Sequence, residues 1–246
     1  MQNPDTSSTV QQRAFAALFI GAGAIAFSPI FVRMSELGPS ATAFYRVFFA
    51  IPVLWIWVYF SNPIEGQHRH PSSPGDYIRL TLAGIFFSCD LAVWHWSIKL
   101  TSVANSTLLA NAAPIFVTLG GFLLFGERFS KLFIIGLICA ITGMFLLMSD
   151  SYTLGHRNLL GDFLGILTAI FYAAYILTVG KLRSEFSTAT VMIWSGIVSC
   201  LALIPMALLS GEGLFASSLT GWLVLLLLAL LSQAGGQSLI TFSLAH

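Results

Sequence analysis

The stretch Leu82–Phe125, LAGIFFSCDLAVWHWSIKLTSVANSTLLANAAPIFVTLGGFLLF, decides the fold, because it holds two apolar runs separated by a short polar break at Lys99–Ser102. Each run has about 20 residues or slightly more, enough to cross a ~30 Å hydrocarbon core as a helix. Each run also contains polar residues or a proline in its interior: Asp90, His95, Asn105, Asn111 and Pro114. An ionisable side chain at membrane depth costs about 2.5 kcal/mol or more. We therefore expect this helix pair to line something polar that other helices enclose.

The composition of the whole chain agrees with this interpretation. Of its 246 residues, 57% are hydrophobic and 9% are charged, and the mean hydropathy is +0.85. Because soluble domains carry about 25% charged residues, the composition predicts an all-α integral membrane protein, a polytopic helix bundle. The net charge of +1 and the absence of a long basic run argue against nucleic acid as a partner.

Metal and cofactor chemistry find little support in the sequence. The three cysteines, Cys89, Cys139 and Cys200, lie inside apolar runs without a CxxC spacing, which is typical of small buried side chains. His68 and His70 lie in a polar loop without neighbouring cysteines or a carboxylate cluster. We expect no metal site, no cofactor and no catalytic residues.

The apolar runs predict eight membrane-spanning helices, with Met1–Gln12 as a disordered tail and the polar segments Ser61–Asp76 and Ser149–Gly161 as loops. A cleaved signal peptide at Ala14–Val32 is an alternative for the first helix. The eight predicted helices are Arg13–Met34, Ser40–Phe60, Tyr77–Ile98, Val103–Phe125, Lys131–Met148, Asp162–Lys181, Thr188–Leu209 and Gly221–Ala245.

A weak internal repeat relates the two halves of the chain. The segment AVWHWSIKL, which ends at Leu100, can be laid over SLITFSLAH at the end of the chain, and with nearly the same offset the first helix lies over the sixth. Because five helices separate the copies, the copies have opposite topology, as in the inverted repeats of transporters. We therefore predict a first repeat at 13–149, with helices one to five, and an incomplete second repeat at 161–246, with helices six to eight. Eight of ten helices would then be present.

Several features in order resemble the drug/metabolite transporter superfamily, and specifically proteins with two EamA domains. They are the small-residue bend from Gly23 to Pro29, the embedded arginine of AFYRVFFA, the segment SIKLTSVANSTLLANAAPIFVTLGG with its proline, and the turn FGERFS. The resemblance covers the chain from about Ala14 to His246. It implies ten helices in an inverted five-plus-five arrangement that moves small organic metabolites, often as an exporter of amino acids and their relatives. Because this chain ends after the eighth helix, we expect low stability and little transport unless the missing helices are restored.

Helical spacing indicates which polar residues share a face. Thr107, Asn111, Pro114 and Thr118 form a stripe on the fourth helix, Thr168, Tyr172 and Tyr175 on the sixth, and Gln233, Gln237 and Thr241 on the eighth. Each stripe suits a cavity wall, although hydrogen bonds between helices or aromatic packing would also explain it. Gly21, Gly23, Pro29 and Pro114 are candidate bend points. The predicted substrate-binding residues are Ser28, Arg46, Asp90, Trp94, Thr107, Asn111, Tyr172, Tyr175, Gln233 and Gln237.

Arg46 and Asp90 are the two charges set well inside spans. Arg46 lies six residues from the start of its predicted helix, hence ~9 Å deep, and Asp90 lies eight residues from the end of the next, hence ~12 Å deep. At these matched depths they would either pair or bind opposite ends of a zwitterionic substrate. A purely structural ion pair, or an Arg46 that reaches the interface alone, are the alternatives.

The predicted function is therefore a secondary transporter, an exporter of small organic metabolites such as amino acids, that works by alternating access in the cytoplasmic membrane. A membrane-embedded enzyme that uses Asp90 and His95 on lipid-linked substrates is one alternative, and a non-transporting membrane protein is another. The expected partners are a small-molecule substrate and the lipid bilayer, and the association of two copies is left open.

The distribution of Lys and Arg predicts that the N-terminus is cytoplasmic. In this orientation the cytoplasmic segments carry seven basic residues and the outer loops carry three, while Arg46 lies in a span, which accounts for all 11. The seven are Arg13, Arg69, Arg79, Arg128, Lys131, Lys181 and Arg183, and the three are Arg33, Lys99 and Arg157.

The orientation can be tested with cysteines introduced at Ser72 and Ser151. We expect a cysteine at Ser72 to resist an impermeant thiol reagent in intact cells, because its loop is predicted to be cytoplasmic, and a cysteine at Ser151 to react. The reverse labelling pattern would show that the predicted orientation is wrong.

Overall fold

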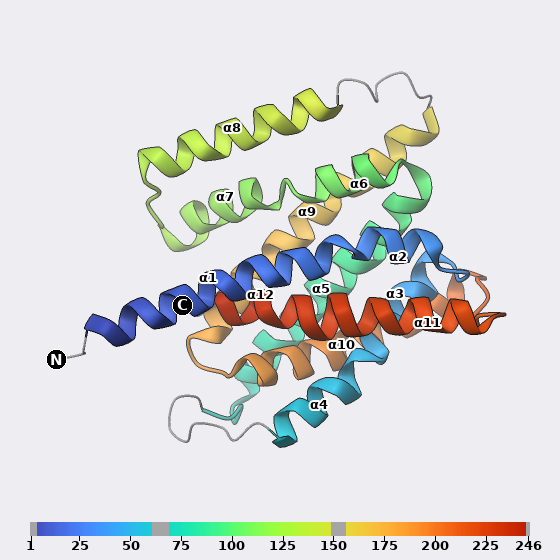
Figure 1. The fold of residues 1–246 in the computed structure, drawn as a ribbon, viewed down its shortest axis with the longest axis horizontal. Helices are drawn as coiled ribbons and strands as arrows, with labels where there is room; N and C mark the ends of the chain where they lie inside the picture. The colour runs from blue at the N-terminus through green and yellow to red at the C-terminus, as the bar shows by residue number, and fades with distance from the viewer. Residues whose placement is uncertain (1–3, 61–68, 149–155, 245–246) are drawn as a thin grey trace. The chain divides into compact units, whose positions relative to one another are not determined.

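The computed structural model describes residues 4–60, 69–148 and 156–244, and within these ranges it contains helices and connecting loops but no strand (Figure 1). The helices are α1 (Pro4–Ala26), α2 (Ser28–Met34), α3 (Pro39–Phe48), α4 (Ala50–Phe60), α5 (Pro74–Leu100), α6 (Val103–Ala110), α7 (Ala113–Phe125), α8 (Lys131–Met148), α9 (His156–Arg183), α10 (Thr188–Leu209), α11 (Leu219–Leu227), the π-helix η2 (Leu228–Gln237) and α12 (Ser238–Ser243).

Seven of these helices or helix series are long and apolar enough to cross a membrane. They coincide with seven of the eight predicted spans, and the remaining one is α8, whose apolar part Lys131–Gly143 is shorter. Large hydrophobic side chains are exposed along α7 and α8, as expected of surfaces that contact lipid. The chain is an all-α polytopic membrane protein.

Three of the spans are interrupted. The first breaks at Phe27, with Pro29 in the first turn of α2, and the fourth breaks at Asn111 and Ala112, just before Pro114. Both bends were predicted from these prolines and are confirmed. The second span breaks at Phe49, ahead of a further proline at the start of α4, and this bend was not predicted.

The predicted starts of α1 and α5 were wrong. The helix α1 begins at Pro4, inside the segment expected to be a disordered tail, and proline is well suited to the first position of a helix. The helix α5 begins at Pro74, so Asp76 lies in its first turn. Ser73 and Asp76 form a capping box, in which the Ser73 N–H donates to the Asp76 carboxylate at 3.1 Å and the Asp76 N–H donates to Ser73 Oγ at 3.2 Å.

The predicted loop Ser149–Gly161 was also partly wrong, since α9 begins at His156. The earlier part of this loop, with Ser151, lies outside the described residues, as do residues 61–68 of the loop that precedes α5.

The described residues divide into two compact units, one from Met1–Ile85 together with Thr178–His246, and the other from Phe86–Leu177. This division follows spatial contacts and not the sequence repeat, so the repeat boundaries 13–149 and 161–246 stay a prediction.

In the first unit, α1 lies alongside η2 and α12, and α3 packs on α10 (Figure 1). The crossing of α1 with η2 depends on two glycines, because a Cβ on Gly21 would lie 2.9 Å from the Gly236 carbonyl oxygen and a Cβ on Gly236 would lie 3.0 Å from the Gly21 carbonyl oxygen. Such close approach through small residues is a common way for membrane helices to pack.

In the second unit, α6 and α7 run along α9. A Cβ on Gly165 of α9 would lie 2.9 Å from Leu109 Cβ, and Ala112, Ala113 and Ala169 form a small buried core. At one end the Thr101 hydroxyl donates to Asp162 Oδ1 at 2.7 Å. Glycine and alanine therefore allow these helices to approach closely at these positions.

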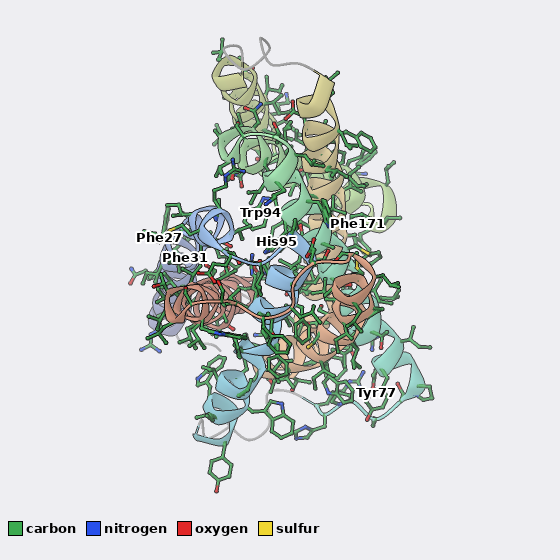
Figure 2. All side chains as sticks on the ribbon, turned by 90° about the vertical axis from the view of Figure 1, so that its right-hand side faces the viewer. Phe27, Phe31, Tyr77, Trp94, His95 and Phe171 are labelled. Carbon is green, nitrogen blue, oxygen red and sulfur yellow. The ribbon has the colours of Figure 1, made fainter. Side chains whose placement is uncertain are left out.

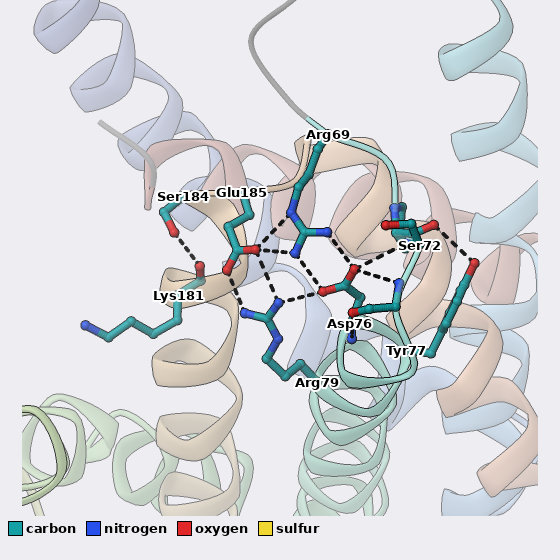
Figure 3. Close-up of polar contacts among 10 residues, drawn as sticks. Arg69, Ser72, Asp76, Tyr77, Arg79, Lys181, Ser184 and Glu185 are labelled. Atoms are coloured by element: carbon teal, nitrogen blue, oxygen red, sulfur yellow. Dashed lines mark hydrogen bonds and ion pairs between the residues drawn. The ribbon is translucent and has the colours of Figure 1, made fainter.

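One end of the first unit carries a cluster of four charged residues (Figure 3). The Asp76 carboxylate accepts from Arg69 at 2.6 Å and from Arg79 at 2.7 Å, and Arg79 also pairs with Glu185 at 2.6 Å. Arg69 binds Glu185 as well and lies over the Phe186 ring, 4.6 Å from its centre. The cluster joins the start of α5 to the turn between α9 and α10.

The Glu185 carboxylate makes this cluster sensitive to acid. Hydrogen bonds from Arg79 and Arg69 lower the pKa of Glu185 from 4.5 to about 2. A carboxylate whose pKa is lowered on folding stabilises the folded state above its ordinary pKa, and this contribution is lost as the pH falls through the lowered value.

We expect the variant Glu185→Gln to unfold at a lower temperature than the wild type at pH 7 in detergent, because the two arginines lose one anionic partner. The difference in Tm should shrink between pH 4.5 and about 2, as Glu185 becomes protonated in the wild type. A difference that is as large at pH 2 as at pH 7 would show that Glu185 acts through packing and not through charge.

The glycine crossing gives a second prediction. Gly236→Leu should destabilise the protein by about 1–3 kcal/mol, the usual cost of forcing a large side chain into a packed contact. Gly23→Leu is the matched control, since a Cβ on Gly23 meets no atom within 4 Å. Thermal unfolding in detergent compares the two, and an equal loss of stability in both would contradict the proposed packing role of Gly236.

Candidate functional site

A buried arginine lies at the centre of the candidate site. Arg46 stands in the last turn of α3, whose residues from Pro39 to Val47 are almost all buried, and its side chain is 4% exposed. Its Nε donates to Gln233 Oε1 at 3.1 Å, and its Nη1 donates to Ser28 Oγ at 2.9 Å. The structure thus brings together three of the ten predicted site residues.

Ser28 reaches Arg46 because of the break in the first span. It is the first residue of α2, is fully buried, and is followed by Pro29. Since proline has no N–H and its ring crowds the carbonyl four residues earlier, the helix is interrupted at Phe27. Figure 2 shows Phe27 and Phe31 next to each other at this bend, with ring centres 6.5 Å apart.

Gln233 stands in the middle of η2, a π-helical stretch within the last span. π-Helical turns are rare and are frequent at functional sites. Gln237 lies one turn further on the same helix and is 2% exposed, and its Nε2 has no hydrogen-bond partner within the described part of the chain. A buried amide N–H₂ of this kind can donate to an acceptor on a bound molecule.

The other six predicted residues belong to the second unit. Tyr175 is fully buried, with its ring 4.7 Å from that of Phe87 and 6.0 Å from that of Tyr172. Trp94 is 9% exposed and meets His95 edge to face at 5.3 Å between ring centres (Figure 2). These five rings form aromatic contacts within the unit, so aromatic packing accounts for part of the conformation of Trp94, Tyr172 and Tyr175.

The polar residues of this unit differ in burial. Asp90 is 6% exposed, Thr107 is half-buried and Asn111, at the end of α6, is exposed. The Thr107 hydroxyl has no hydrogen-bond partner in the described ranges, whereas the Thr118 hydroxyl donates to the Pro114 carbonyl at 2.7 Å. Because the span breaks at Asn111, the predicted stripe along it is not continuous.

Arg46 and Asp90 belong to different units. Their pairing, and their joint contact with a zwitterionic substrate, stay predictions. The role of all ten residues in substrate binding also stays a prediction.

Sequence reasoning missed two features of the first unit. Arg183, counted as a loop charge, is 3% exposed, and its guanidinium donates to the carbonyls of Thr241, at 3.3 Å, and Phe186. Glu36 and Glu212, in the loops before α3 and α11, accept backbone N–H groups at helix starts. The contacts of Arg183 with Thr241, of Glu36 with Ser217 and of Glu212 with Ser40 each join residues far apart in the chain, so no local sequence signal points to them.

The described ranges contain no group of three or more His, Cys, Asp or Glu side chains that could hold a metal ion. The site contains a buried guanidinium whose hydrogen-bond partners include a hydroxyl and an amide side chain. Such a group can bind a carboxylate through two parallel N–H···O hydrogen bonds.

The chain is similar in sequence to a known transporter and in fold to a solved structure. It is 28% identical over 209 residues to an uncharacterized transporter of Archaeoglobus fulgidus, a match that covers 82% of this chain and 67% of the relative. A solved crystal structure has the same fold, with a TM-score of 0.69 at 15% identity over 96% of this chain and 78% of that one.

A family model, that of the EamA-like transporter family, matches residues 12–149, which is more than half of the 246 residues. This match agrees with the resemblance seen in the sequence and with the all-helical membrane fold. The chain therefore belongs to the EamA-like transporter family.

Proposed function

We propose that this protein exports small organic metabolites with a carboxylate group, such as amino acids and related compounds, across the cytoplasmic membrane by alternating access. In this proposal the N-terminus is cytoplasmic, two inverted repeats alternate around the site, and the chain is a transporter and not an enzyme. The family supports the transport of small molecules. The substrate class rests on Arg46.

Arg46 is the observation that carries the proposal. A charged residue inside a span costs about 2.5 kcal/mol or more, whereas hydrogen bonds between helices contribute roughly 0.6 kcal/mol each. Helix packing alone is therefore a poor reason to keep an arginine in this place. Ser28 and Gln233 orient the guanidinium through hydrogen bonds, and a guanidinium in this orientation is suited to bind an anionic group.

The carboxylate preference follows from the shape of the guanidinium. Its planar, always charged fork matches the two oxygens of a carboxylate, and a lysine cannot reproduce this geometry. Compounds whose carboxylate is esterified or absent should therefore be transported poorly. The Gln237 amide, buried on the same helix as Gln233, supplies a further donor for substrate oxygens.

The enzyme alternative involved Asp90 and His95. The His95 Nδ1 lies 2.6 Å from the Leu91 carbonyl oxygen, which is the hydrogen bond to the preceding turn typical of a structural histidine. This contact favours a packing role for His95. Transport assays distinguish the two functions directly.

The test is uptake and efflux of a labelled amino-acid panel in proteoliposomes. Arg46→Gln should lower transport by about tenfold to a hundredfold, the range expected when a hydrogen bond to a charged group is lost. Arg46→Lys should also be impaired, and Ser28→Ala and Gln233→Ala should lose less, because they only orient the guanidinium.

Arg13→Gln is the matched control, since Arg13 is an exposed arginine in α1, away from the site. Its transport should equal that of the wild type. Methyl esters of the transported amino acids should fail to compete, and vesicles of defined orientation show the direction of net transport. If Arg46→Gln transports as well as the wild type, or if the esters compete equally, the proposed site is wrong.

A further inference from the structure

The short helix α2 packs on α11 and η2 in the first unit and is bounded by a break on each side. It is separated from α1 by the break at Phe27 and from α3 by the extended backbone at Ser35 and Gly38. Its first residue, Ser28, is fully buried against Arg46, whereas Ile30 and Met34 are 51% and 58% exposed. The first residue of α2 thus contacts the guanidinium, while Ile30 and Met34 are open to the surroundings.

Glu36, two residues after the end of α2, fastens it to the start of α11. The Glu36 carboxylate accepts from the backbone N–H of Ser217 at 2.8 Å, from the Ser217 hydroxyl at 2.9 Å and from the N–H of Ser218 at 3.1 Å, and it also binds the Ser218 hydroxyl. A carboxylate at this position also interacts favourably with the positive end of the α11 dipole.

Two further facts describe this contact. A Cβ on Gly221 would lie 2.6 Å from Glu36 Oε2, so glycine leaves the space that the carboxylate occupies. The hydrogen bonds from Ser218 and Ser217 lower the pKa of Glu36, which keeps the carboxylate charged. The contact nevertheless lies at the surface, where water can replace each hydrogen bond.

A second glutamate makes a similar contact, from the loop before α11 to the start of α3. Glu212, in the loop between α10 and α11, accepts from the N–H groups of Ser40 and Ala41 at 3.0 and 3.1 Å and so caps α3. Because α3 also packs along α10, this cap belongs to a firmly packed helix pair. The two glutamates therefore hold elements that differ in packing: α3 packs on α10, α4, α11 and η2, whereas the shorter α2 packs on α1, α11 and η2 and leaves Ile30 and Met34 exposed.

We propose that α2 is a lid over Arg46, hinged at Phe27 and latched to α11 by Glu36, while Glu212 fixes the frame against which the lid closes. On the proposed function, substrate reaches or leaves Arg46 when the Glu36 latch opens and Ser28 moves away from the guanidinium. The proposal assigns different roles to two glutamates that look alike in the sequence.

The first experiment measures lid opening without any transport. Ser28→Cys serves as a reporter in purified protein that keeps Cys200 and has Cys89 and Cys139 replaced by alanine. Adding Glu36→Ala should raise the rate at which a thiol reagent modifies the cysteine at position 28 by about tenfold, because the loss of a helix cap weakens the closed state.

Cys200, which is 7% exposed in α10, reports on the frame in the same sample. The rate at which the reagent modifies Cys200 should not change with Glu36→Ala. Glu212→Ala should instead lower the Tm and raise the modification rates at position 28 and at Cys200 together, since it loosens the packing of α3 on α10. The lid is contradicted if Glu36→Ala leaves the rate at position 28 unchanged or raises both rates equally.

The second experiment tests whether the lid must open for transport. Glu36→Cys and Ser218→Cys, combined in a protein that retains Ser28, are joined by a short bifunctional thiol reagent that a reductant removes. Cross-linking should abolish transport and reduction should restore it to the level of the uncross-linked double variant.

The two proposals fail in different ways. Undiminished transport by the cross-linked protein would overturn the lid and leave the transport function intact. If Glu36→Ala raises the rate at position 28 selectively but no version of the protein transports a carboxylate substrate, the lid stands and the proposed substrate class is wrong.

Discussion

In the hydrocarbon core, a backbone N–H or carbonyl group has no water to bind, so each must find a partner inside the protein. The rest of this structure depends on this constraint. It confines the bends to positions where the chain repairs its own hydrogen bonds. At Phe27 the carbonyl accepts from the N–H groups of Ile30 and Phe31, at 3.1 and 3.2 Å, and at Phe49 the N–H donates to the Tyr45 carbonyl at 3.1 Å. The spans can therefore bend next to a proline without leaving open polar groups.

The same constraint separates the charged residues by role. Arg69, Asp76, Arg79 and Glu185 gather at one end of the first unit, where Arg69 and Arg79 keep 43% and 40% of their side chains exposed and opposite charges meet. Arg46 instead lies inside a span, with the neutral groups of Ser28 and Gln233 as hydrogen-bond partners. The charges at the helix ends join neighbouring helices through ion pairs. A charge within a span is costly in the membrane, so we explain its presence by the group that it binds.

Much of the fold could be predicted from the sequence because hydropathy and proline act locally. Apolar length identified the spans, and Pro29 and Pro114 identified two bends. Pro205 shows the limit of this reasoning, since it lies inside the unbroken α10. The helix starts at Pro4 and Pro74 were missed because helices extend past the apolar run, although the capping box at Ser73 and Asp76 was visible in the sequence.

The site was predictable as a set of residues but not as a geometry. Arg46 and Gln233 stood out as polar residues in apolar runs, yet their contact spans 187 positions and depends on the break before Ser28 and on the glycine crossing of α1 with η2. The π-helical backbone of η2 has no signature in the sequence. Glu36 and Glu212 were overlooked for the same reason, because a carboxylate in a polar loop looks unremarkable until the helix start that it caps is known.

The two buried arginines of the first unit show how the choice of partner limits the role of a charge. Arg183 donates to two backbone carbonyls, of Thr241 and Phe186, and these cannot move without moving their helix or turn. The partners of Arg46 include the side chains of Ser28 and Gln233, which can change rotamer or move with a short helix. A guanidinium bound to main-chain carbonyls fixes the end of α12 in place, while one bound to a hydroxyl and an amide can exchange them for a ligand. A structural and a binding arginine thus differ in the free energy needed to release their partners, and a side-chain partner such as Ser28 or Gln233 is released more easily than a main-chain carbonyl.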